Sequence, residues 1–118
     1  MKQSLIEACN KMASLKESLN LVKIKARLNE LDELQQALDF WNDPDAARRT
    51  IKEYNTSKEL YESFHTNEKA LTGLLESVEE MTKVYDEEMF MLIEEEYHDI
   101  IKNFEEFEIK VLLSHDYD

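Results

Sequence analysis

The sequence is poor in the residues that interrupt regular structure. It contains one glycine, one proline and one cysteine among 118 residues. Folds rich in β-strands need frequent turns, which are built largely from glycine and proline, so this scarcity excludes a β-rich domain. A lone Cys9 cannot form a disulfide within the chain. Because 42% of the residues are hydrophobic, the composition also excludes disorder and favours an all-α fold.

Basic residues are scarce as well. Fourteen Lys and Arg stand against 27 Asp and Glu, which gives a net charge of −13. Phosphate groups repel such a domain, so direct DNA binding is not expected. The chain has no run of about 18 apolar residues that could span a membrane. Its N-terminus, MKQSLIEACNKMASL, is too interrupted by charge for a signal peptide. We therefore expect a single cytoplasmic domain over residues 1–118.

Two apolar seams with alternating spacings of three and four dominate the second half of the chain. The first comprises Phe64, Asn67, Leu71, Leu74, Val78, Met81 and Tyr85, and the second comprises Phe90, Ile93, Tyr97, Ile100, Phe104, Phe107 and Val111. This spacing is typical of helices packed along their length. Only residues 86–89 separate the seams, so the pattern predicts an antiparallel hairpin. In this register Tyr85 faces Phe90, and Phe64 lies near Val111.

Asn67 is the one polar member of the seams, and the same register places it near Phe107. We interpret it as a partly hydrated position that helps to fix the register, with a recognition role as the alternative.

Two shorter helices are predicted upstream, at about 3–19 and 21–38. The first has a weak apolar stripe that includes Leu5, Cys9 and Met12, and the second has a narrow stripe of leucine and isoleucine. Asn20 either caps a break between them or lies within one continuous helix. If both cover the hairpin, the fold class is all-α: an elongated helical bundle built on a long antiparallel coiled-coil-like hairpin.

The stretch DFWNDPDAARR, residues 39–49, contains the only tryptophan and the only proline. Asp43 is suited to cap a helix that has Pro44 at its first position. No breaker follows, which predicts one helix over about 44–85 and a last helix over about 88–113. Phe40 and Trp41 lie just outside the cap, where we expect them to fold back as an apolar plug between the second helix and the hairpin.

No catalytic, cofactor-binding or metal-binding residues are predicted. Two Glu-x-x-His motifs, Glu62 with His65 and Glu95 with His98, have the spacing of metal ligands on a helix face. In the predicted register, however, His98 lies opposite about residue 77, roughly 18 Å along the axis from His65. The two pairs therefore cannot share a metal. His115 lies in a polar tail and is expected to be exposed.

Two charged surfaces remain open to interpretation. Arg48, Arg49 and Lys52 form a basic cluster, which is either a solvated face or a contact for phosphate or an acidic partner. The last helix and its tail, residues 86–118, carry 12 acidic and two basic residues. This acidic face is either solvated or available to a basic protein partner.

The stretch DFWNDPDAARRTIKEY, preceded by KARLNELDELQQ and followed by EFEIKVLLSHDYD, resembles the N-terminal domain of the bacterial peptide chain release factor 2 family. The resemblance covers residues 23–118 in order and spacing. Its signature positions are Phe40, Trp41, Asn42, Asp43, Pro44, Tyr117 and Asp118.

The resemblance implies a cytoplasmic protein that acts on the ribosome at UGA or UAA stop codons. It implies a helical first domain that reaches the stalk and GTPase-associated region and can contact the class II release factor. The Ser-Pro-Phe and Gly-Gly-Gln elements that read the codon and promote hydrolysis in the family cannot be assigned to this sequence, which has one glycine.

Three interpretations follow from these observations. The chain is an excised docking domain, a free-standing ribosome-associated factor without release activity, or an unrelated coiled-coil scaffold. Continuation of the source gene past Asp118 into a Gly-Gly-Gln coding region would favour the first, and a stop codon the second. The joint presence of FWND and the terminal YD disfavours the third.

Overall fold

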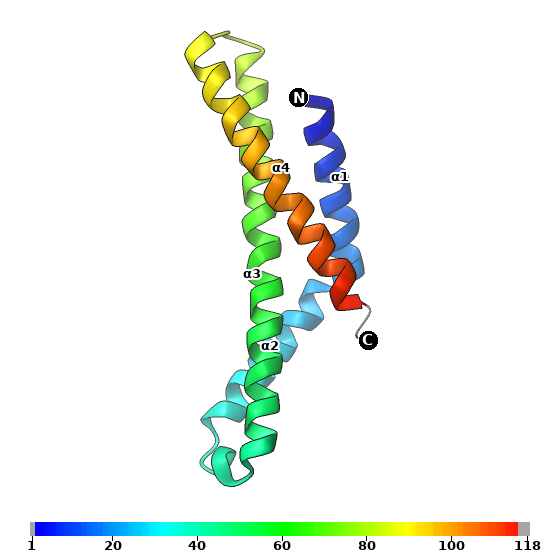
Figure 1. The fold of residues 1–118 in the computed structure, drawn as a ribbon, viewed down its shortest axis with the longest axis vertical. Coiled ribbons are helices and arrows are strands. Elements are labelled where there is room, and N and C mark those ends of the chain that lie inside the picture. The colour runs from blue at the N-terminus through cyan, green and yellow to red at the C-terminus, as the bar shows by residue number, and fades with distance from the viewer. Residues whose placement is uncertain (1, 116–118) are drawn as a thin grey trace. The chain divides into compact units, whose positions relative to one another are not determined.

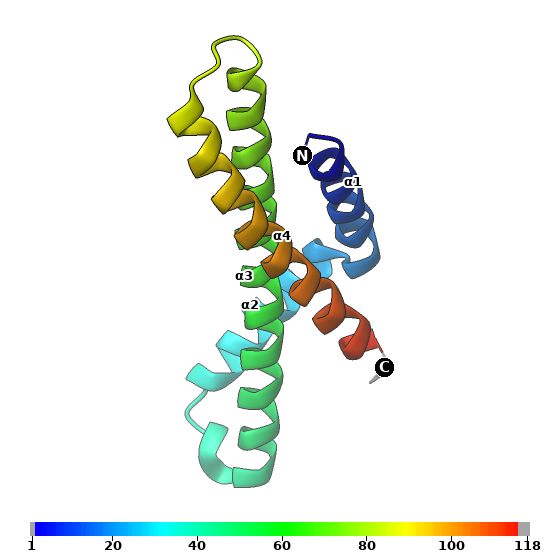
Figure 2. The same cartoon turned by 45° about the horizontal axis from the view of Figure 1, so that its top comes forward.

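The computed structural model describes residues 2–115, and this part of the chain contains helices and no strands. The helices are α1 (Lys2–Leu19), α2 (Leu21–Gln36), the 3₁₀ turn η1 (Phe40–Asn42), α3 (Pro44–Met81) and α4 (Glu87–His115). Figures 1 and 2 show their course. The predicted all-α class is confirmed.

The helices form two compact units, which are described separately below. In the described part, the first unit joins residues 2–15 to residues 64–115, and the second is Lys16–Ser63. Two compact units can belong to one folding domain, so the single domain over residues 1–118 stays a prediction.

The first unit is built on the hairpin of α3 and α4. The start of α1 and the whole of α4 run in one direction, and α3 runs in the opposite direction (Figures 1 and 2). Nine of the 14 predicted seam residues are buried in the core, together with one face of α1, whereas Tyr85 is exposed and Met81, Phe90, Tyr97 and Ile100 are half-buried. The buried apolar side chains are Leu5, Ala8, Met12, Phe64, Leu71, Leu74, Val78, Ile93, Phe104, Phe107 and Val111.

The aromatic contacts of the hairpin agree in part with the predicted pairing: Tyr85 meets Phe90 as predicted, but Phe64 meets Phe107, which the register had paired with Asn67. The rings of Tyr85 and Phe90 have centroids 6.2 Å apart, which confirms that these two residues face each other. Phe64 contacts Phe107 with the same centroid separation. Asn67 is buried, with 9% of its surface exposed. Asn67 is therefore more buried than the predicted partly hydrated position, and its role in fixing the register stays a prediction.

The stripe on α1 differs from the predicted one. Ala8, and not Cys9, is fully buried between Leu5 and Met12, while Cys9 is half-buried. Positions 5, 8 and 12 keep the spacing of three and four that forms one helix face. Ala8 also lines a hollow between α1 and α4, which the spacing pattern alone does not reveal.

The long helix α3 ends four residues before the predicted end at 85. The amide groups of Thr82 and Lys83 donate to carbonyl oxygens three residues back, at 3.2 and 3.0 Å, and this tighter turn closes the helix. Asp86 then caps α4, because its Oδ1 accepts hydrogen bonds from the amides of Glu88 and Met89. Tyr85 consequently lies in the turn and is exposed.

Gly73 lies on the exposed face of α3, and nothing lies within 4 Å of the position its Cβ would occupy. We expect Gly73→Ala to raise the free energy of unfolding by about 1 kcal/mol, because alanine loses less backbone entropy in a helix. Urea denaturation followed by circular dichroism measures this change. Gly73→Val should gain less, since β-branched residues fit helices less well. No increase for alanine would show that the site is strained or contacted.

The second unit contains the end of α1, α2, η1 and the first part of α3. Its buried residues are Leu21, Leu28, Leu31 and Ala47. Asn20 separates α1 from α2 in the left-handed region, with φ 50° and ψ 69°, and its side chain accepts a hydrogen bond from the amide of Lys23 at 3.4 Å. Asparagine tolerates this backbone conformation better than most residues. Of the two alternatives at this position, the cap is therefore correct.

Candidate functional site

The FWND turn, residues 40–43, lies in the second unit, where η1 packs against α2. The amide of Phe40 donates to the carbonyl of Ala37 at 3.1 Å, and the amide of Asn42 donates to that of Asp39 at 3.0 Å. Successive side chains of a 3₁₀ turn diverge by about 120°, so two neighbours cannot both face inward. Phe40 is half-buried, whereas 64% of the surface of Trp41 is exposed.

The predicted apolar plug is therefore wrong for Trp41. The two rings touch edge to face, with centroids 5.0 Å apart, but only Phe40 turns partly toward the protein. Leu38 is also fully exposed. The turn thus presents two large apolar side chains to solvent instead of sealing the core.

The start of α3 has the predicted cap. Asp43 Oδ1 accepts a hydrogen bond from the amide of Ala46 at 3.2 Å, and Pro44 is the first helical residue. The amide of Ala47 reaches the carbonyl of Asp43 at 3.0 Å. These contacts confirm the predicted helix cap at Asp43 and Pro44.

The basic cluster, Arg48, Arg49 and Lys52, lies on the first turns of α3, and all three side chains are exposed. Arg48 pairs with Asp45 at 3.4 Å, and its Nε donates to the carbonyl of Pro44. Arg49 and Lys52 are three residues apart and so share a helix face. The cluster and Trp41 belong to the same short segment, but partner contact by these residues stays a prediction.

Arg27 on α2 forms a charged link that the sequence did not suggest. Its guanidinium group lies 2.8 Å from the carboxylate of Glu53 on α3 and 3.0 Å from that of Glu30. Hydrogen bonds to Glu30 and Glu53 raise the pKa of Arg27. The Glu30 pair has the i, i+3 spacing visible in the sequence, but the Glu53 pair depends on how the two helices meet.

A cation–π contact also links α2 to α3 in this unit. The Nζ atom of Lys25 lies 5.5 Å from the centroid of the Tyr61 ring. Such exposed contacts contribute about 1 kcal/mol or less.

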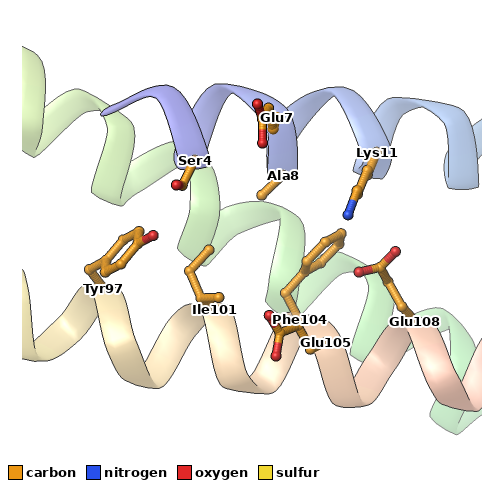
Figure 3. Close-up of a pocket in the computed structure, with 9 residues that line it drawn as sticks. All are labelled: Ser4, Glu7, Ala8, Lys11, Tyr97, Ile101, Phe104, Glu105 and Glu108. Carbon is orange, nitrogen blue, oxygen red and sulfur yellow. The ribbon is translucent and has the colours of Figure 1, made fainter. Parts of the chain in front are cut away.

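Figure 3 shows a hollow in the first unit, between α1 and α4. Its volume is about 210 Å³. Tyr97 and Phe104 project from α4 toward α1, and Lys11 on α1 points toward Glu108 (Figure 3). The lining includes Ser4 and three glutamates, Glu7, Glu105 and Glu108. Sequence reasoning missed this hollow because it depends on the contact between α1 and α4.

The two Glu-x-x-His motifs lie on exposed helix faces. His65 lies against the ring of Phe64 and pairs with Glu68 at 3.6 Å, and His98 lies against Tyr97. Over residues 2–115, no group of three or more acidic, histidine or cysteine side chains is arranged to hold a metal ion. Burial raises the pKa of the Cys9 thiol, which lowers the fraction of the reactive thiolate at neutral pH.

Three residues named in the sequence analysis have no described side chain. Tyr117 and Asp118 fall outside residues 2–115, and His115 ends α4 without a described side chain. In the described helices, none is long and apolar enough to cross a membrane.

Comparison with known proteins agrees with the resemblance found in the sequence. A model of the PCRF domain family matches residues 24–118. Peptide chain release factor 2 of Listeria innocua is 30% identical over 118 residues, which is all of this chain and 32% of that protein. The same factor from Nautilia profundicola is 31% identical over 109 residues, 92% of this chain and 30% of its own length.

Peptide chain release factor 2 of Staphylococcus epidermidis is 26% identical over 118 residues, which is all of this chain and 32% of that protein. The chain thus spans about a third of the length of these curated relatives. No solved structure gives a significant match.

Proposed function

This chain belongs to the PCRF domain family, and we propose that it is the N-terminal docking domain of a release factor 2-like protein that acts in translation termination on the ribosome. The match over residues 24–118 is the observation that carries the proposal. The relatives are named peptide chain release factors and are about three times as long. We assign this chain to docking and not to hydrolysis, because Gly73 is its only glycine and no Gly-Gly-Gln sequence is present.

The finer parts of the proposal concern where the domain binds. We propose that it contacts the stalk and GTPase-associated region of a ribosome paused at a UGA or UAA codon, with the class II release factor as a further partner. Such a role places the protein in the cytoplasm. The exposed Trp41 and the basic cluster support a contact surface in the second unit, since aromatic and arginine side chains are enriched at interfaces.

Cosedimentation of the purified chain with ribosomes tests the proposal. We expect saturable binding that is lost when the stalk proteins are removed from the ribosome. Replacing Arg48, Arg49 and Lys52 together by Gln should weaken binding at least about tenfold, because each charged contact at an interface contributes on the order of 1 kcal/mol. Higher salt should weaken binding of the unmodified chain in the same way.

A matched control removes three exposed lysines from the first unit, Lys2, Lys69 and Lys102, again by replacement with Gln. Its net charge equals that of the test variant, so a general effect of charge would weaken both equally. Equal binding by the two variants would contradict the role of the basic cluster. No ribosome binding by any form of the chain would contradict the docking function itself.

A further inference from the structure

The end of the α3–α4 hairpin contains an open hollow of about 460 Å³. Its lining comes from the last turns of α3, the connecting turn and the first turns of α4, all within the first unit. The apolar part of the lining consists of Met81, Val84, Met89 and Ile93. In both views of the fold, α1 begins short of this turn (Figures 1 and 2).

Large apolar side chains in this part of the chain are exposed, and two of them, Val84 and Met89, line the hollow. Val84 and Tyr85 in the turn are 76% and 69% exposed, and Met89 is half exposed. Met91 and Leu92 on the next turn of α4 are exposed as well. Exposed apolar side chains are common singly, but a group of five within nine residues is typical of an interaction site.

The charge around the hollow identifies the kind of partner. Residues 79–99 contain one basic residue, Lys83, and the acidic residues Glu79, Glu80, Asp86, Glu87, Glu88, Glu94, Glu95, Glu96 and Asp99. Such a surface repels the phosphates of RNA and of anionic membranes. It also repels a second copy of itself. A cationic protein segment is attracted, and its charges would be complementary to the acids.

The shape and side chains of the site favour a helix as the cationic segment. Amphipathic helices bind in apolar grooves through side chains at helical spacing. Methionine side chains are flexible and polarisable, and they adapt to such partners. Two methionines, Met81 and Met89, line the hollow.

We propose that the hairpin end, residues 77–93, binds a cationic amphipathic helix of a partner protein. The apolar stripe of that helix covers Val84 and Met89, and its lysine or arginine side chains lie over Glu79 and Glu80. This inference rests on the proposed docking function for its biological setting. It assigns a second contact surface to the domain, in a different unit from the basic cluster.

Fluorescence anisotropy with a labelled synthetic peptide tests the inference on the full chain. The peptide contains leucine at helical spacing and lysine elsewhere. We expect saturable binding in a ratio of one to one, weakened at least tenfold by Val84→Ser combined with Met89→Ser. The control pair, Ile109→Ser and Leu112→Ser, removes equally exposed side chains from the other end of α4 and should change binding less than twofold. Circular dichroism verifies that both variants remain folded.

A second pair of variants tests the charge. Glu79→Gln with Glu80→Gln should weaken binding and reduce its salt dependence, whereas Glu105→Gln with Glu106→Gln should do so less. A scrambled peptide of the same composition should bind poorly. Equal binding of the scrambled peptide would overturn the proposal, since attraction would then be purely electrostatic. Self-association that is abolished by the Val84 and Met89 changes would overturn it in favour of a second copy.

Ribosome cosedimentation separates this inference from the proposed function. If the chain sediments with ribosomes but neither binds the peptide nor depends on Val84 and Met89, the inference fails alone. If it binds the peptide as expected but never sediments with ribosomes, the proposed function fails and the helix-binding surface remains.

Discussion

Leu74→Asp is expected to unfold the first unit. Leu74 lies in the middle of the α3 seam with 2% of its surface exposed. The substitution removes a buried apolar side chain, which alone costs about 2–5 kcal/mol. It also places a carboxylate in an apolar seam, which adds several kcal/mol or forces the group to take up a proton. The sum is comparable to the whole stability of a small domain.

Circular dichroism and thermal melting measure this effect. We expect a large loss of helical signal at room temperature or a melting transition lowered by more than about 15 °C. Thr72→Asp is the matched control, because it adds the same charge to the exposed face of the same helix. An unchanged melting curve for Leu74→Asp would mean that the α3–α4 register is wrong.

Phe64→Ala is expected to have the second largest effect, a loss of about 3–5 kcal/mol. Phe64 is completely buried, and its ring lies 6.2 Å from that of Phe107. Removal of the ring leaves a cavity and breaks this aromatic pair, which contributes about 1 kcal/mol beyond burial. Urea denaturation followed by circular dichroism gives the change in unfolding free energy.

Trp41→Ala serves as the comparison for Phe64→Ala, with the same measurement of unfolding free energy. Although tryptophan is the larger side chain, its exposure here means that the change should cost less than about 1 kcal/mol. Similar losses for the two variants would show that Trp41 is buried in solution. A small loss for Phe64→Ala would show that the core of the first unit is not formed as described.

Periodicity predicted most of the fold because the hairpin is a repeated local pattern. Spacings of three and four placed Phe64, Leu71 and Leu74 on one face, and all three are buried. The cap of α3 could also be predicted from the sequence, since Asp43 and Pro44 act within one helical turn. Features of this kind depend on residues near in sequence, so composition and spacing are sufficient to find them.

The errors occur where the geometry of a turn or the packing of a helix face decided the outcome. The weak apolar stripe of the first helix was assigned to Cys9, whereas Ala8 is the buried residue between Leu5 and Met12. The end of α3 was predicted too late, because the tight turn at Thr82 and Lys83 that closes it cannot be read from apolar spacing. Trp41 was judged by its hydrophobicity, whereas the 3₁₀ geometry of the turn determined its direction.

The candidate surfaces were only partly accessible to sequence reasoning. The basic cluster and the acidic face of α4 are visible as charge runs. The hollows beside Ala8 and Met89 are not, because each is formed by residues from two helices whose contact no single segment encodes. The family match supports a biological setting, and the positions of exposed side chains indicate where to look for partners within it.

The exposure of Trp41 also makes the protein its own optical reporter. It is the only tryptophan in the chain, and an indole ring in water emits at longer wavelength than one that is covered. A partner that covers the FWND turn should shift this emission to the blue, with no added label. A peptide bound only at the hairpin end should leave the emission unchanged, so one spectrum can distinguish occupancy of the two surfaces.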